Sequence, residues 1–215
     1  YLVWWWYPEV VLQNTNEAKS ALLQSYLDVM IYRDIIDRYS LKNEHVLNHL
    51  IKSLIVSNTK HININRLYNT YKSLWYSISK NTIYEYFTYL HNVFFVSSLT
   101  HAYRKTYFDK VYLIDNWFMN LYTQEFNLWQ KFENVIYKFL KKKHSMLWYN
   151  DQPIEIDFTD TKQQWQVCRQ ISEENYLRET AIGLHSLPTT LVTTNYSSLV
   201  PEYITQTRYD TFLLG

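Results

Sequence analysis

Residues 64–99 read INRLYNTYKSLWYSISKNTIYEYFTYLHNVFFVSSL, and this stretch decides the fold of the N-terminal half. The spacing of its apolar residues predicts two helices, at about 64–73 and 79–92, with a tight turn between them. Ser79 is a good N-cap for the second helix because its hydroxyl can accept a backbone N–H of the first turn. The apolar residues 93–99 then predict a strand. Helix, turn, capped helix and strand form the layout of a winged helix-turn-helix.

The second of these helices begins with side chains that can bind a phosphate. Hydroxyls, amides and the helix dipole all favour an anion at a helix N-terminus, and two neighbouring side chains add to the same surface. The candidate DNA-binding residues are Lys72, Ser79, Lys80, Asn81, Thr82 and Tyr84. The alternative is that the winged helix packs against a neighbouring domain and never touches DNA. Glu85, on the same helix, is consistent with that alternative.

The composition indicates a globular chain with no overall pull toward nucleic acid. Of the 215 residues, 47% are hydrophobic and 19% are charged, and 21 Lys and Arg against 20 Asp and Glu give a net charge of +1. The single cysteine, Cys168, excludes a disulfide framework and any multi-cysteine zinc site, and it fits a reducing cytoplasm. No apolar run approaches the roughly 20 residues of a membrane span. We therefore expect a cytoplasmic protein without a membrane partner, whose DNA contacts would come from a local patch.

The second half of the chain predicts a mixed helix and strand core. After the strand 110–115, the pattern gives an amphipathic helix, three short strands, a helix and a β-branched strand. Their expected ranges are 131–143, 146–150, 153–159, 164–170, 173–186 and 189–194. The expected fold class is therefore α+β or α/β, with a helical domain at 14–105 followed by an α/β domain at 106–215.

An acidic pair in this α/β core is the candidate catalytic site. Glu133 lies on the expected helix and Asp157 on the middle strand, and carboxylates there could hold a divalent cation that activates water. A nuclease-like core then needs E-x-K on the next strand, where this chain has Gln166 and Cys168. Gln166 supplies no anionic ligand and Cys168 no ammonium group, so we expect a degenerate site in which Glu133 and Asp157 bind metal weakly if at all. Cys168 is expected to be a buried, unreactive thiol.

The chain contains none of the motifs that bind nucleotide phosphates. G-x-x-x-x-G-K-[ST] and G-x-G-x-x-G are both absent, and only two glycines are present. We expect no cofactor to bind this chain itself.

Several motifs appear in order along nearly the whole chain and together form a specific set. They are YPEVVL at 7–12, SYLDVMIYRDIIDRY at 25–39, INRLYNTYKSLWYSISKNTIYEYFTYLHNVFF at 64–95, KVYLIDNWF at 110–118, FEN at 132–134, EIDF at 155–158, WQVC at 165–168 and RET at 178–180. This set resembles the C-terminal region of AAA-type ATPases of bacteria and archaea that carry a DUF4143 domain.

The resemblance implies a particular domain organisation and role. In that family a P-loop ATPase precedes a winged-helix stretch and a module similar to restriction-endonuclease-like folds. Residues 1–13 would then be the end of the preceding ATPase region, and ATP and Mg would bind in that region. The implied function is an accessory, non-catalytic module that binds DNA or a protein partner. The alternatives are a metal-dependent nuclease using Glu133 and Asp157, and a scaffold that recognises protein only.

Glycine is scarce and tryptophan abundant in a way that needs an explanation. There are 2 glycines, where typical usage of about 7% would give roughly 15, and there are 8 tryptophans. Relatives of the resembled family tend to have glycine where this chain has Trp5, Trp6, Trp75, Trp117 and Trp129. Each position is a plausible turn or cap, where a positive φ is cheap only for glycine. We hypothesise that these five positions are UGA codons that the source organism reads as glycine; the alternative is that the tryptophans are genuine. The chain starts at Tyr1, not at Met, and we expect it to be a fragment.

Overall fold

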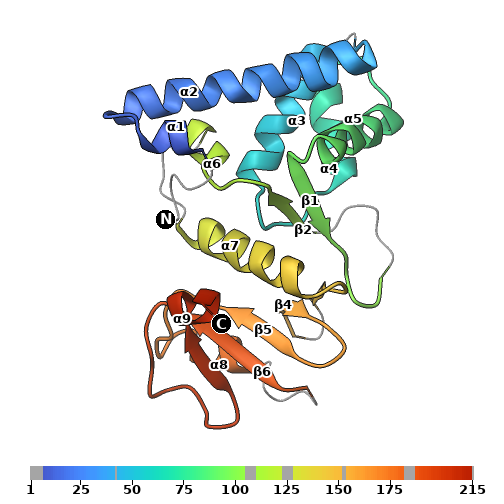
Figure 1. Ribbon diagram of the computed structural model, residues 1–215. Coiled ribbons are helices and arrows are strands. Elements are labelled where there is room, and N and C mark those ends of the chain that lie inside the picture. The colour runs from blue at the N-terminus through green and yellow to red at the C-terminus, as the bar shows by residue number, and fades with distance from the viewer. Residues whose placement is uncertain are drawn as a thin grey trace. The chain divides into compact units, whose positions relative to one another are not determined.

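The computed structural model describes residues 7–41, 43–104, 110–122, 128–151, 154–181 and 187–214. The protein is of the mixed α+β class, with helices and two β-sheets (Figure 1). The chain divides into two compact units, the first made of residues 1–98 and 110–128 and the second of 99–109 and 129–215. Residues 110–128, assigned to the second domain from the sequence, thus group with the first unit. Within the described residues, no helix is both long and apolar enough to cross a membrane.

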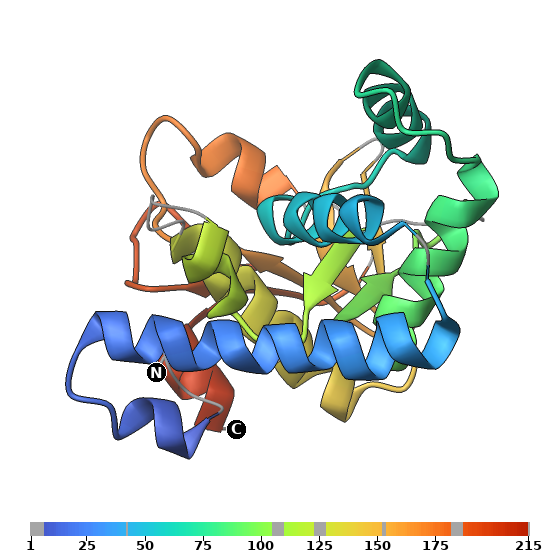
Figure 2. The same cartoon turned by 90° about the horizontal axis from the view of Figure 1, so that it is seen from above.

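The first unit is mainly helical. Its elements are α1 (Pro8–Val11), α2 (Asn16–Val29), the π-helix η1 (Met30–Asp37), α3 (Glu44–Val56), α4 (Ile64–Ser73), α5 (Lys80–Asn92), the paired strands β1 (Val96–Leu99) and β2 (Lys110–Leu113), and α6 (Phe118–Tyr122). Figures 1 and 2 both show α2 and η1 as one continuous long helix, with α1 turned back beside its start. Its core is aliphatic and aromatic, and α3 contributes most, with Leu47, Leu50 and Leu54 fully buried.

Side-chain caps set where three helices of the first unit begin. Thr15 accepts the N–H of Ala18 ahead of α2 at 3.2 Å, and Asn63 accepts the N–H of Arg66 ahead of α4 at 3.0 Å. Ser79 accepts the N–H of Thr82 at 3.1 Å, so the predicted cap of α5 is confirmed. Each cap satisfies a backbone donor that has no partner inside its helix.

Three helices of this unit end in the same left-handed conformation without glycine. Ser40, Trp75 and Phe94 have φ values of 49°, 62° and 58°. In each case the next residue donates its N–H to a carbonyl five residues earlier, as in Tyr76 to Tyr71 at 3.0 Å, which is the Schellman arrangement. The chain thus uses side chains with a Cβ where glycine is the usual residue.

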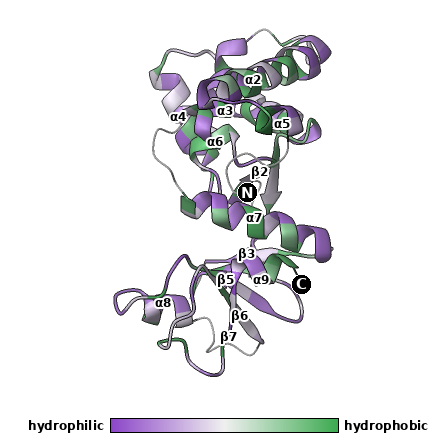
Figure 3. Ribbon diagram, turned by 60° about the vertical axis from the view of Figure 1, so that its left-hand side comes forward, coloured by the Kyte–Doolittle hydropathy of each residue, from purple (hydrophilic) through white to green (hydrophobic). Residues whose placement is uncertain are grey.

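The second unit is built on a five-stranded sheet. Its elements are α7 (Leu128–Lys143), β3 (Trp148–Asn150), β4 (Ile156–Thr159), β5 (Gln164–Val167), α8 (Tyr176–Thr180), β6 (Thr189–Thr193), β7 (Thr205–Arg208) and α9 (Tyr209–Leu214). The strands follow the order β3-β4-β5-β6-β7; the first two pairings are antiparallel and the last two are parallel. All four residues of both β4 and β5 are buried, and α7 carries a polar and an apolar side along its length (Figure 3).

Most of the expected elements are present, and the differences are local. The expected strand 93–99 begins only at Val96, because residues 93–95 form the end of α5 and its turn. The expected helix 173–186 is short, with α8 ending at Thr180, and residues 182–186 lie outside the described residues. The strand β7 and the helix α9 were not predicted from the sequence. The short β7 has an exposed to half-buried pattern that gives no apolar signal.

Candidate functional site

The candidate DNA-binding residues lie on α4, in the cap of α5 and in the first turns of α5. Lys72 is exposed near the end of α4, and Ser79, Lys80 and Asn81 are exposed at the start of α5. Thr82 and Tyr84 follow in α5 and are half-buried. The helices α4 and α5 follow one another in the chain and are in contact. The six residues therefore lie on two neighbouring helices, including the N-cap of the second.

Contacts with α4 hold the ammonium group of Lys80 in place. Its Nζ donates to Oδ1 of Asn65 at 2.6 Å and lies 5.5 Å from the centre of the Tyr68 ring. The hydroxyl of Ser79 caps the helix by accepting the N–H of Thr82. A positive charge and a helix N-terminus are thus presented together, which is an arrangement that favours an anion.

The local charge of these two helices differs from that of the long helix α2–η1. Residues 64–92 contain three basic residues, Arg66, Lys72 and Lys80, and one acidic residue, Glu85. Residues 16–37 contain Lys19 and Arg33 but four acidic residues. Arg66, Lys72 and Lys80 are all exposed. Of these two surfaces of the first unit, the α4–α5 face is therefore the basic one.

Trp75 lies at the turn between α4 and α5 and is 93% exposed. Its positive φ makes it one of the four described non-glycine residues with that conformation. Trp117 lies in a turn, as expected, but neither Trp117 nor Trp129 has a positive φ. Trp117 is buried, stacked on Phe118 at 4.4 Å, and Trp129 is the second residue of α7. Trp5 and Trp6 lie outside the described residues.

The second unit contains a buried polar cluster at the predicted acidic site. Oδ2 of Asp157 on β4 accepts the N–H of Val167 on β5 at 3.0 Å. The side chain of Gln166 accepts the N–H of Asp157 through Oε1 at 3.2 Å. Asp157 and Gln166 are almost completely buried. The two predicted residues therefore join adjacent strands to each other.

Glu179 of α8 completes this cluster and was given no role from the sequence. Nε2 of Gln166 donates to Oε2 of Glu179 at 3.1 Å, and the guanidinium of Arg178 binds the other oxygen, with Nε at 3.0 Å. Glu179 is itself buried. Strand alternation could place Asp157 and Gln166 on one face, but no spacing rule relates a residue on a separate short helix to them. The only sequence signal was its place in the motif RET.

Cys168 comes directly after the end of β5, two residues beyond Gln166, and is buried. Its Sγ donates to the carbonyl of Gln170 at 3.2 Å. Burial raises the pKa of the Cys168 thiol to about 12, and the nearby carboxylate of Glu179 acts in the same direction. The expectation that Cys168 is buried is confirmed, and its raised pKa disfavours the nucleophilic thiolate.

Glu133 is buried on α7 and has an interaction partner of its own. Among the residues that the structure describes, no group of three or more His, Cys, Asp or Glu side chains is arranged to hold a metal ion. Within the polar cluster, Gln166 hydrogen-bonds to both Asp157 and Glu179, and its neutral amide offers no anionic ligand.

These elements define an α+β protein with an exposed basic face on α4 and α5 in one unit and a buried polar cluster around Asp157, Gln166 and Glu179 in the other. Residues 1–123 match the model of a family described as "Domain of unknown function (DUF8612)", and the chain belongs to that family. The match includes α4, α5 and the basic face, whereas the polar cluster lies beyond it.

One curated relative extends over both units. It is the "Uncharacterized protein MJ1544" of Methanocaldococcus jannaschii, 27% identical over 185 residues, which cover 80% of this chain and 42% of the relative. The chain thus spans about two fifths of the length of that relative. No solved structure matches the chain.

Proposed function

We propose that this chain is an accessory, non-catalytic module of an AAA-type ATPase that binds DNA through the α4–α5 face. The observation that carries the proposal is the pairing of a helix-turn-helix with a local excess of positive charge, at Lys72, Lys80 and Arg66. In this interpretation α3, α4 and α5 are the three helices of a winged-helix domain. The strands β1 and β2 are then its two-stranded sheet.

The ATPase part of the proposal rests on two supports. The ordered motifs resemble the region that follows a P-loop domain in DUF4143-containing ATPases, and the archaeal relative is more than twice as long as the part it shares with this chain. In this proposal ATP and Mg²⁺ bind a P-loop domain outside residues 1–215, since these residues contain no P-loop motif.

The DNA-binding test is a titration of a labelled duplex followed by fluorescence anisotropy at several salt concentrations. We expect binding that weakens as salt rises, because lysine contacts to phosphate release counterions. The variant Lys72→Ala/Lys80→Ala should bind about tenfold more weakly or worse. The matched control Lys19→Ala/Arg38→Ala removes two positive charges around α2–η1 and should bind as the wild type does. Equal affinity of the two double variants would contradict the proposed face. Absence of any DNA binding would leave a protein-recognition scaffold as the remaining function.

The second unit is proposed to be a restriction-endonuclease-like domain that no longer cleaves DNA. Helix α7, the antiparallel strands β3, β4 and β5, helix α8 and the parallel strand β6 follow the order expected of such a core. Its acidic positions are Glu133 and Asp157, but Gln166 is engaged with both Asp157 and Glu179, and Cys168 offers no ammonium group. Incubation with plasmid DNA and Mg²⁺ or Mn²⁺ should therefore give no cleavage. Cleavage that disappears in Asp157→Ala would favour the metal-dependent nuclease instead.

A further inference from the structure

The outward face of α5 carries an amide and a carboxylate that are both exposed. Ile83, Phe87 and Leu90 bury the other side of this helix in the core of the first unit. Asn81 and Glu85 are exposed and share the outward face, because residues four apart in an α-helix are neighbours on its surface. Within the described residues, neither of these two side chains has a hydrogen-bond partner. We call Asn81 and Glu85 the outer pair.

The positive charges of this region lie beside the outer pair. Lys80 is the first residue of α5, and its Nζ lies 2.6 Å from Oδ1 of Asn65 and 5.5 Å from the centre of the Tyr68 ring. An ammonium group has three N–H donors, so Lys80 can still bind an anion. Arg66 and Lys72 are exposed on α4, the helix that contacts α5 (Figure 1). The cations are thus at the start of α5 and on its neighbour.

This division between cations and the outer pair matches the way in which a helix-turn-helix binds duplex DNA. The second helix lies in the major groove with its N-terminal residues at the base edges, while the first helix crosses the backbone. Phosphate contacts position the protein, and contacts to base edges select the sequence. Asn81 and Glu85 are the second and sixth residues of α5, so both lie in the half of the helix that would contact bases.

We propose that Asn81 and Glu85 determine which duplex DNA sequence the α4–α5 face binds, an inference that rests on the proposed function. In the major groove, Oδ1 of Asn81 accepts a hydrogen bond from the N6 amino group of adenine, and Nδ2 donates to N7 of the same base. The carboxylate of Glu85 accepts from the N4 amino group of cytosine. The ligand is therefore a duplex that presents an adenine and a cytosine close together.

The charge of Glu85 favours a cytosine over the other possible contacts. It is the one acidic residue of the stretch 64–92, and a phosphate would repel its carboxylate. An ionised carboxylate only accepts hydrogen bonds, whereas guanine and thymine present acceptors in the major groove. Residues four apart on a helix differ by about 6 Å in height, and base pairs are about 3.4 Å apart. The adenine and the cytosine should therefore be about two base pairs apart.

Selection from a pool of randomised duplexes, followed by sequencing, tests the contact of Asn81. We expect the wild-type chain of 215 residues to enrich duplexes with an adenine and a cytosine at this spacing. Asn81→Ala should lose the preference for adenine, keep that for cytosine, and bind the selected duplex about tenfold more weakly. The matched control Asn16→Ala removes an exposed amide at the start of α2 and should select the wild-type sequence. Unchanged selection by Asn81→Ala would contradict the contact with adenine.

Glu85→Gln should exchange one preferred base for another. A glutamine amide pairs with adenine, so this variant should select adenine where the wild type selects cytosine. The control Glu202→Gln makes the same change of charge at an exposed position of the second unit and should leave the selected sequence as it is. A merely structural role of Glu85 would not change the preferred base. If Glu85→Gln still selects cytosine, its carboxylate does not contact that base.

The salt dependence separates failure of this inference from failure of the proposed function. Asn81→Ala should leave the slope of log K against log salt as in the wild type, because a contact to a base releases no counterion. Duplex binding that depends on Lys72 and Lys80 but enriches no sequence would overturn the roles of Asn81 and Glu85, while the proposed function would stand. Absence of duplex binding would overturn both.

Discussion

At the scale of single residues, Trp75 shows how the chain manages without glycine. The indole is almost fully exposed while the backbone is left-handed, so the side chain contributes little packing and the conformation is unfavourable for a residue with a Cβ. We predict that Trp75→Gly stabilises the protein by about 1 kcal/mol in urea unfolding, with an unchanged m-value. The control Asn69→Gly, inside α4, should destabilise it because glycine is a poor helix former. If Trp75→Gly destabilises the protein, the indole of Trp75 stabilises the fold in spite of its exposure.

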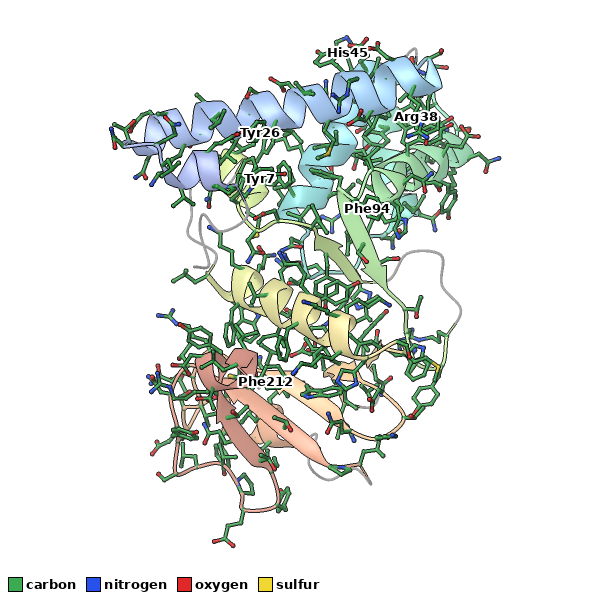
Figure 4. The ribbon with its side chains drawn as sticks, in the orientation of Figure 1. Tyr7, Tyr26, Arg38, His45, Phe94 and Phe212 are labelled. Atoms are coloured by element: carbon green, nitrogen blue, oxygen red, sulfur yellow. The ribbon has the colours of Figure 1, made fainter. Side chains whose placement is uncertain are left out.

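The same residue bears on the hypothesis that five tryptophans are glycine in the source organism. Trp75 occupies a position that favours glycine, but so do Ser40 and Phe94, which no UGA codon can explain. Trp117 packs edge-on against Tyr7 at 5.8 Å, as a genuine core aromatic does. Tyr7 in turn lies beside Tyr26, where Figure 4 labels both rings. Codons other than UGA at positions 5, 6, 75, 117 and 129 would end the hypothesis.

Asp160 is one of the carboxylates through which we expect stability to depend on pH. Burial alone would raise its pKa, but the N–H groups of Lys162 and Gln163, at 2.7 and 2.8 Å, together with His144 at 2.9 Å, lower its pKa overall. A pKa lowered by folding adds stability above the unfolded value, and that stability is lost as pH falls through the folded value. We predict that Asp160→Asn costs about 1 kcal/mol at pH 7 and that the difference shrinks below about pH 4. Urea unfolding at both pH values, with exposed Glu202→Gln as the control, measures it; a difference independent of pH would contradict the assignment.

At the scale of elements, Ser79 caps α5 and also belongs to the proposed DNA surface. Removing the cap in Ser79→Ala should cost about 1 kcal/mol of unfolding free energy, since a backbone donor loses its partner. Ser79→Asp keeps a capping oxygen and should retain the stability. On the proposed DNA surface, however, the added negative charge repels phosphate, so Ser79→Asp should bind duplex DNA more weakly than Ser79→Ala does. If Ser79→Asp binds DNA more tightly than Ser79→Ala, the N-terminus of α5 is not part of the DNA interface.

Gln166 links β4, β5 and α8. Because its side chain is neutral, it can hydrogen-bond within the polar cluster without adding a buried charge. We predict that Gln166→Glu lowers the unfolding free energy by about 2–3 kcal/mol at pH 7, because a third carboxylate is buried beside Asp157 and Glu179. The exposed Gln170→Glu adds the same charge and should have little effect. Added Mn²⁺ should raise the melting temperature of Gln166→Glu and not of the wild type, since only the variant offers three anionic ligands. Wild-type stability in Gln166→Glu would show that the amide does not hold these elements together.

The elements that sequence reasoning could predict are those with a local signal. Apolar spacing and the Ser79 cap defined α4 and α5, and alternation defined β4. Asp157 and Gln166 could be related because adjacent strands bring alternate residues together. Glu179 could not, because its place in the cluster depends on how α8 packs and not on spacing. The strand β7 is short and polar, and it forms by pairing in parallel with β6, a contact between chain segments that no local pattern encodes.

At the scale of the whole molecule, the near-neutral net charge limits how DNA can be bound. With +1 overall we expect no long-range attraction, and in the proposed function the affinity comes from the exposed cations of the α4–α5 face. Each phosphate contact lowers the slope of log K against log salt by about 0.9 for duplex DNA. Arg66, Lys72 and Lys80 together therefore predict a slope between about −2 and −3.

That slope is measured by repeating the anisotropy titration across a salt series. It shows whether the cations that contact phosphate lie on α4 and α5 or elsewhere in the molecule. Lys72→Ala and Lys80→Ala should each make the slope shallower by about 1, whereas Arg38→Ala should leave it unchanged. A slope steeper than about −5 would require cations from outside α4 and α5 and would move the interface elsewhere. A slope near zero would mean that DNA is held without phosphate contacts, and the basic face would then lose its proposed role.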